Sequence, residues 1–168
     1  MKYRKLGQTG IEISEIGFGA WGIGGNAGGA AGYGATDDRE SKAALRRSFE
    51  LGVTFYDTSD LYGFGHSESL IGEVFKGARE KVVMATKVGF HSPHEPQDFS
   101  SAHLRRSLEA SLKRLQTDYL DLYQLHNPPV ELLEREEEIL KTLEAMKREG
   151  KIRAFGIPFA HRTTAPRR

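Results

Sequence analysis

Short β-branched and aromatic segments alternate along this chain with longer segments whose apolar residues recur at helical spacing. This alternation limits the fold more than any other feature, because it predicts a parallel sheet whose strands are joined by helical crossovers. The expected strands are Ser14–Phe18, Val53–Asp57, Val82–Lys87, Tyr119–His126 and Ile152–Ile157. The expected helices begin after Asp37 or Asp38, at Ser67, near Ser100 and at Glu131, the last ending at Glu149. The pattern predicts an α/β fold and leaves open both a doubly wound sheet and a (β/α)8 barrel.

The start of the chain predicts a small hairpin and a glycine-rich loop. Tyr3–Leu6 and Ile11–Ile13 flank a turn that contains two glycines, which is typical of a β-hairpin. A loop rich in glycine is expected over Gly19–Ala35. Asp37 has the side chain of a helix N-cap, and Gly52 suits the left-handed position after the end of that helix.

Polar side chains stand at the ends of three consecutive expected strands. Asp57, Lys87 and His126 are 30 and 39 positions apart, which fits one βα unit between each pair. Tyr62 follows Asp57 by five positions, in a loop punctuated by glycine. Taken singly, each has an ordinary interpretation as a loop or core residue. Because parallel strands end at one edge of a sheet, where α/β folds place their chemistry, we expect the four to form one cluster.

The cluster suits proton transfer to a carbonyl. A phenol has a pKa of about 10 and is a weak acid at neutral pH, but a neighbouring ammonium stabilises the phenolate and lowers that pKa. A buried Lys87 needs a carboxylate partner, and Asp57 is the natural one. His126 could orient a substrate carbonyl or assist the proton.

A second motif competes with this interpretation. The run Gly17–Gly22 matches the pattern Gly-x-Gly-x-x-Gly, which alone indicates a Rossmann-type dinucleotide site. That site requires a helix to open at the motif and hold the pyrophosphate. More glycines follow here, and the next helix is expected only at Asp38, so a flexible βα loop is favoured.

Composition argues against several other classes of function. With 24 basic and 23 acidic side chains the net charge is +1, so we expect neither nucleic acid nor an anionic membrane as the partner. There is no cysteine, which excludes disulfides and cysteine metal ligands. No metal site is expected either, since His91 and His94 share a proline-rich loop with only Glu95 and Asp98 nearby.

The chain also shows no targeting or membrane signal. Its first residues lead into no apolar run, and no stretch approaches the ~18 apolar residues of a membrane span. We therefore expect a cytoplasmic protein.

At this point the sequence resembles the aldo-keto reductases, over nearly the whole chain to about Gly156. The segments that carry the resemblance are Ile16–Trp21, Gly52–Thr58, Leu61–Gly63, Ala85–Lys87, Ser107–Leu115, Asp118–His126 and Gly150–Gly156. The resemblance implies a (β/α)8 barrel whose bottom is closed by an N-terminal hairpin. It also implies hydride transfer from NADPH, or NADH, to small aldehydes and ketones.

The resemblance assigns roles to particular residues. Asp57, Tyr62, Lys87 and His126 match the family's catalytic residues, with Tyr62 as the general acid. The cofactor's nicotinamide is expected beside Gly19, Ala20, Trp21 and Asp57.

Two departures from the family lead to an incomplete barrel. A full barrel takes about 250 residues, whereas 168 are present, so the hairpin and about five of eight βα units are expected. The family's Ser-Asn pair after the fifth strand is replaced by residues 158–168, predicted to be a disordered basic tail after a barrel unit of 1–157. The loops that carry the family's cofactor phosphate site fall outside this length.

The competing hypothesis is a non-catalytic fragment that self-associates through its open sheet edge or binds a partner.

Strand periodicity makes the register testable. If Asp57, Lys87 and His126 point into the barrel, residues two positions earlier must do the same, namely Phe55, Ala85 and Gln124. The apolar helix and core residues Phe49, Leu70, Leu108 and Leu143 should pack on the outer face.

Overall fold

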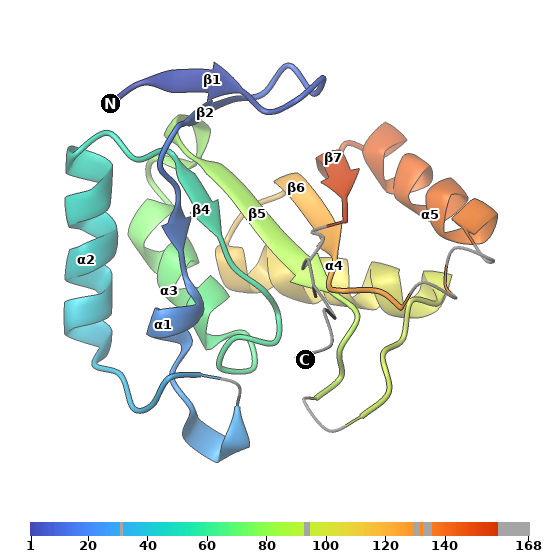
Figure 1. Cartoon of the computed structure of the whole chain (residues 1–168), viewed down its shortest axis with the longest axis horizontal. Helices are drawn as coiled ribbons and strands as arrows, with labels where there is room; N and C mark the ends of the chain where they lie inside the picture. Colours follow the sequence, from blue (N-terminus) through green and yellow to red (C-terminus); the bar gives the residue numbers. More distant parts are fainter. Residues whose placement is uncertain (31, 93–94, 130–131, 133–135, 158–168) are drawn as a thin grey trace, which may run out of the picture.

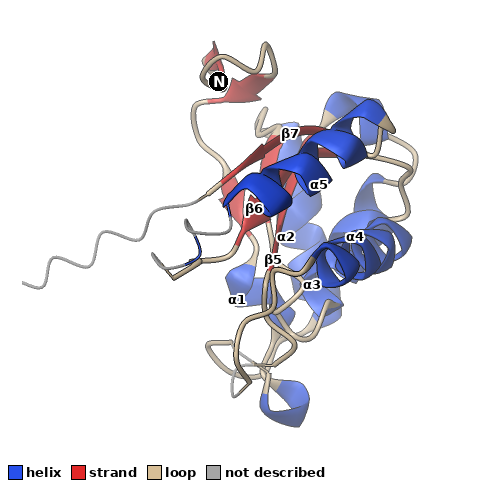
Figure 2. Ribbon diagram, turned by 90° about the vertical axis from the view of Figure 1, so that its right-hand side faces the viewer, coloured by secondary structure: helices blue, strands red, loops and turns tan. Residues whose placement is uncertain are grey.

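The computed structural model describes residues 1–30, 32–92, 95–129, 132 and 136–157, which form two sheets. The larger is a parallel five-stranded sheet formed in chain order by β3 (Phe18–Gly19), β4 (Phe55–Asp57), β5 (Val83–Val88), β6 (Leu120–Leu125) and β7 (Ile152–Gly156). The helices gather on one side of it, as Figures 1 and 2 show; they are α2 (Asp38–Glu50), α3 (His66–Phe75), α4 (Ser101–Leu115) and α5 (Glu136–Arg148).

The order of the strands decides between the two folds left open by the sequence. Each strand pairs with the one before it, so the sheet grows in a single direction from β3 to β7. A doubly wound sheet reverses its direction and carries helices on both faces. Growth in one direction with helices on one face is the arrangement of a (β/α)8 barrel, of which these residues form a part.

The hairpin lies where a barrel has its bottom. β1 (Tyr3–Lys5) pairs with β2 (Glu12–Ser14) in a separate antiparallel sheet, at the end of the large sheet where its strands begin (Figure 1). Ile11 and Ile13 pack there against Val83. Ser14 therefore ends the hairpin, and the expected strand Ser14–Phe18 is wrong, because the sheet strand covers only Phe18 and Gly19.

The glycine-rich segment is more ordered than its composition predicts. One turn of helix, α1 (Trp21–Gly24), and a 3-10 turn at Ala27–Gly29 interrupt the expected loop. The turn is held by close packing: a Cβ atom on Gly24 would lie 2.8 Å from the backbone of Tyr62, so only glycine fits there. The crossover helix nevertheless begins at Asp38, with Asp37 accepting a hydrogen bond of 2.8 Å from the backbone N–H of Glu40.

The two faces of the sheet follow the predicted register. Tyr56, Met84 and Tyr123 face the helices, where Phe49, Leu70, Leu108 and Leu143 pack as expected. Phe55 packs on the opposite face with Val83 and Leu122, and Asp57 pairs in register with Ala85. The predicted placement of Phe55, Ala85 and Gln124 on the inner face is confirmed.

Two expectations fall partly or wholly outside the described residues. The last expected helix, α5, is described from Glu136 to Arg148, and part of its expected first turn lies outside. The expected tail, residues 158–168, lies outside altogether. Within the described part, no helix is both long and apolar enough to cross a membrane.

Candidate active site

The edge of the sheet where β4, β5 and β6 end brings the four expected residues together. Asp57 ends β4, Lys87 lies near the end of β5, and His126 follows the last residue of β6. Tyr62 reaches the same place from the loop between β4 and α3. Parallel strands pairing in register place these ends side by side, because Asp57 pairs with Ala85 and Lys87 with Gln124.

The buried amine of Lys87 is the centre of the cluster. It donates a short hydrogen bond to Asp57 Oδ1 and another of 2.9 Å to the carbonyl oxygen of Thr58. It also lies 3.4 Å from the Tyr62 hydroxyl, within hydrogen-bond reach. The three acceptors use the three N–H bonds of an ammonium, so the charge is held in one position beside the phenol.

Asp57 is held from both sides. Its second carboxylate oxygen, Oδ2, accepts a hydrogen bond of 3.1 Å from the side-chain amide of Gln124. Gln124 projects into the site because it lies two positions before His126 on the same strand face. The sequence signal for its position was therefore the strand period, but nothing in the sequence indicated that it would bind Asp57.

His126 is buried and neutral. Its Nδ1 lies 3.1 Å from Ser59 Oγ, and its ring meets the edges of Tyr62 and Phe90. Burial, assisted by the positive charge of Lys87 and opposed by Asp57, lowers the pKa of His126 to about 4. An imidazole with this pKa carries no charge at neutral pH, and its Nε2 makes no hydrogen bond to any described residue.

The glycine-rich segment borders the cluster. Gly19 pairs with Asp57, and the N–H of Ala20 donates to the Asp57 carbonyl oxygen at 2.8 Å. The ring of Trp21 is stacked against Tyr62 with 6.1 Å between the ring centroids, and it is 39% exposed. These residues therefore border the cluster next to Asp57 and Tyr62.

Several contacts in the site were not foreseen. Ser59 and Phe90 touch the His126 ring. The side-chain amide of Gln97 donates a hydrogen bond of 2.6 Å to the backbone carbonyl oxygen of His126. Phe90 and Gln97 come from the loop after β5, so only the folded chain brings them to a residue at the end of β6.

A buried ammonium, a carboxylate, a phenol and a neutral imidazole, gathered at one edge of the sheet, are the groups that can hold a carbonyl oxygen and give it a proton. The ammonium of Lys87 lies where its charge would stabilise a phenolate at Tyr62.

Comparison of the chain with known proteins leads to one family. The family model described as "Aldo/keto reductase family" matches residues 15–162. Aldo-keto reductase YhdN of Bacillus subtilis is 40% identical over 162 residues, which are 94% of this chain and 46% of that protein. Methylglyoxal reductase YeaE of Escherichia coli is 35% identical over 147 residues, or 88% and 46% of the two chains.

Solved structures give the same result. Aldo-keto reductase AKR11C1 from Bacillus halodurans, in its holo form, superposes with a TM-score of 0.80 at 37% identity, covering 94% of this chain and 50% of that one. An aldo-keto reductase from Klebsiella pneumoniae in complex with NADPH has a TM-score of 0.72 at 33% identity, covering 90% and 47%. The chain thus spans about half the length of the relatives it matches.

Proposed function

The chain belongs to the aldo/keto reductase family, and on that premise we propose that it carries the proton-donating part of a carbonyl reductase site. The proposed reaction is the reduction of an aldehyde or ketone to an alcohol, with NADPH as cofactor and NADH as the alternative. The observation that supports it best is the Lys87 amine, which joins the Asp57 carboxylate to the Tyr62 hydroxyl.

The four residues divide the proposed work. Tyr62 gives its hydroxyl proton to the carbonyl oxygen, and the ammonium of Lys87, 3.4 Å away, stabilises the phenolate that remains. Asp57 keeps the ammonium in place and is itself held by Gln124. The neutral ring of His126 is held through Nδ1, which lies 3.1 Å from Ser59 Oγ, and we assign this ring to orienting the substrate carbonyl.

The residues that border the cluster suit a nicotinamide. Trp21 is 39% exposed and lies beside Tyr62, and a Cβ atom built on Gly19 would meet no atom within 4 Å, so there is open space at the end of β3. We assign the cofactor's nicotinamide end to Gly19, Ala20, Trp21 and Asp57. When bound, the cofactor supplies the hydride for the carbonyl carbon.

The test compares two tyrosines in the same chain. NADPH binding is followed by fluorescence, and turnover is measured with methylglyoxal as a small carbonyl probe. Tyr62→Phe should lower turnover by roughly 10²-fold or more while NADPH binding is retained. Tyr119→Phe is the matched control, because Tyr119 lies outside the cluster, beside Arg79. Near-normal turnover in Tyr62→Phe would refute the assigned role.

A second function is favoured by an apolar groove next to β7. Within the described residues β7 pairs only with β6, so its outer edge is open. Beside it lies a cavity of about 210 Å³ whose lining includes Leu125, Ile139, Leu140, Leu143, Phe155 and Ile157. Open edges and exposed apolar surface recruit other chains, so we propose that this chain also associates with itself through β7 and the groove.

Sedimentation velocity at micromolar concentration tests the self-association. Leu140→Glu, in the groove, should shift the chain to monomer, whereas Leu51→Glu should leave it associated because Leu51 is exposed elsewhere, after α2. A wild-type chain that stays monomeric contradicts this second function. A monomer that binds NADPH tightly would support the reductase proposal and contradict the self-association.

We place the end of the barrel unit at residue 157 and propose that residues 158–168 lie outside it. Limited trypsin treatment should remove the segment after Arg162 without changing the NADPH titration. Loss of NADPH binding on cleavage would move that boundary.

A further inference from the structure

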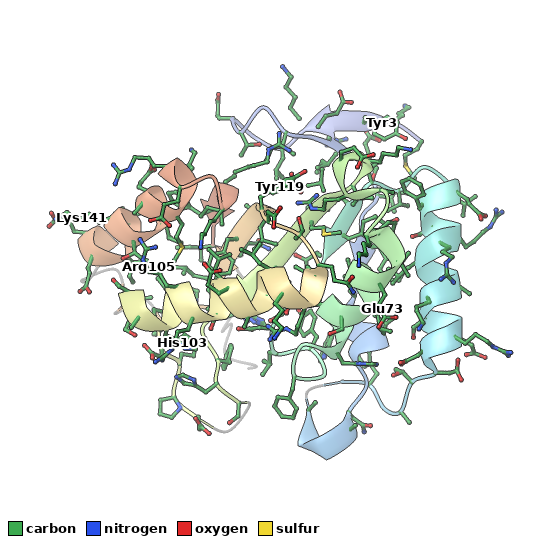
Figure 3. All side chains as sticks on the ribbon, turned by 180° about the vertical axis from the view of Figure 1, so that it is seen from behind. Tyr3, Glu73, His103, Arg105, Tyr119 and Lys141 are labelled. Carbon is green, nitrogen blue, oxygen red and sulfur yellow. The ribbon has the colours of Figure 1, made fainter. Side chains whose placement is uncertain are left out.

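Two histidines and an aspartate meet where the loop after β5 joins α4. His91 lies in the loop, Asp98 shortly before α4, and His103 in the first turn of α4, where Figure 3 labels it. One ligand atom from each residue lies within 4.8 Å of the other two. The sequence predicts no metal here, because the residues of the loop alone do not make a set of metal ligands. His94 lies outside the described residues, and His103 is supplied by the helix.

The distances fit a small metal ion. His91 Nε2 lies 3.4 Å from Asp98 Oδ2, and His103 Nδ1 lies 4.0 Å from the same oxygen. Two tetrahedral zinc ligands, each about 2.0–2.1 Å from the ion, are roughly 3.4 Å apart. One pair is therefore already at the required spacing, and the other needs a small side-chain rotation.

Neighbouring groups orient two of the three ligands. Asp98 Oδ1 accepts a bond of 2.8 Å from the Ser100 N–H, which leaves Oδ2 turned toward the histidines. His103 Nε2 lies 3.3 Å from Ser107 Oγ, which leaves Nδ1 turned toward Asp98. Metal-binding histidines usually hydrogen-bond through the nitrogen that does not hold the metal, and this arrangement has that form.

The protonation states agree with the geometry. Burial, and then the neighbouring His91, lower the pKa of His103, while Asp98 opposes them. The Ser100 N–H, more than any other group, lowers the pKa of Asp98. A neutral imidazole and an ionised carboxylate are the forms that bind metals.

We propose that His91, Asp98 and His103 bind a divalent transition metal of the zinc class. Imidazole nitrogens suit zinc, cobalt, nickel and copper, whereas calcium and magnesium prefer oxygen ligands alone. Three protein ligands leave a fourth position for water, and His91, with its side chain 39% exposed, gives the ion access from solvent.

The ion would tie the loop to α4 beside the candidate active site. Phe90, adjacent to His91, packs on the His126 ring with 5.1 Å between centroids. Gln97, adjacent to Asp98, donates to the His126 carbonyl oxygen. Metal binding therefore stabilises the two loop residues that support His126.

Cobalt and zinc titrations of the chelator-treated chain test the proposal without any measurement of activity. Co²⁺ should give the visible absorption bands of a tetrahedral complex at one ion per chain, and Zn²⁺ should displace it and raise the melting temperature. Ca²⁺ should do neither.

Two variants each remove one of the proposed ligands. His91→Ala and Asp98→Asn should each weaken Co²⁺ binding at least ~10-fold, and because His91 is partly exposed its loss should not unfold the chain. His66→Ala is the matched control: His66 contacts Asp38 at 2.8 Å, but no third ligand joins this pair among the described residues. Absence of the bands, or equal binding by wild type and His91→Ala, would overturn the proposal, as would loss of binding in His66→Ala.

Discussion

Replacing Arg114 with methionine should destabilise the fold by about 3–5 kcal/mol, the typical cost of removing one partner from a buried ion pair. Glu68, on α3, is fully buried, and its carboxylate accepts bonds of 2.6 Å from Arg114 Nε and from the Thr86 hydroxyl. Methionine keeps an apolar stem of similar length but not the charge. The Glu68 carboxylate would then keep only the neutral Thr86 hydroxyl as a hydrogen-bond donor and would lose its ionic partner.

This loss is large compared with the whole stability of the chain. Single domains have net stabilities of about 5–15 kcal/mol, and a domain of this size loses about 2–4 °C of melting temperature per kcal/mol. We therefore expect the melting temperature of Arg114→Met to fall by roughly 6–20 °C.

A second arginine on the same helix is the control. Arg105 makes two bonds of 3.0 Å to Glu149, but this pair lies on the surface, with the two side chains 44% and 40% exposed; Figure 3 labels Arg105. Urea unfolding followed by circular dichroism should show only a small fraction of the Arg114→Met effect in Arg105→Met. Adding Glu68→Gln to Arg114→Met should recover most of the loss. Equal effects of the two arginine variants, or no recovery, would refute the reasoning.

Two further predictions concern the candidate site and its surroundings. Lys87→Met should remove the charge beside Tyr62 and lower carbonyl turnover by roughly 10²-fold with an unchanged circular dichroism spectrum, and near-normal turnover would show that the ammonium has no part in the chemistry. Asp60 has its pKa raised to about 7 by burial and, secondarily, by the charge of Glu68. The folded state thus holds this proton more tightly than the unfolded chain, so stability should fall as pH rises from about 4 to 7; Asp60→Asn should remove this slope, worth up to a few kcal/mol at about 1.4 kcal/mol per pKa unit. Parallel urea-unfolding profiles of wild type and Asp60→Asn between pH 5 and 8 would contradict it.

Much of the site could be predicted because its residues follow local rules. The period of two along a strand places Asp57 on the face of Phe55, and Lys87 on the face of Ala85, whatever the rest of the chain does. The end of a strand is also recognisable locally, where an apolar run gives way to polar residues. These two rules, with the motifs that resemble one family, were enough to name Asp57, Tyr62, Lys87 and His126, all of which meet in the structure.

The failures arose where packing overrides local preference. A run of glycines predicts an open loop, yet α1 forms because Ala20 bonds to Asp57 and Gly24 packs on Tyr62. The isolated segment lacks these contacts, so its composition alone does not indicate a helix.

Local sequence patterns were sufficient to predict the alternation of helices and strands, the face on which each strand residue lies, and the identity of the four clustered side chains. Only the tertiary structure decided that the strands add in one direction, that Gln124 holds Asp57 across 67 positions, and that His103 joins His91 and Asp98. The difference comes from the distance along the chain over which each interaction acts. Periodicity and capping act over a few residues, whereas these contacts depend on how whole elements pack, and their free energy is shared among residues far apart in the chain.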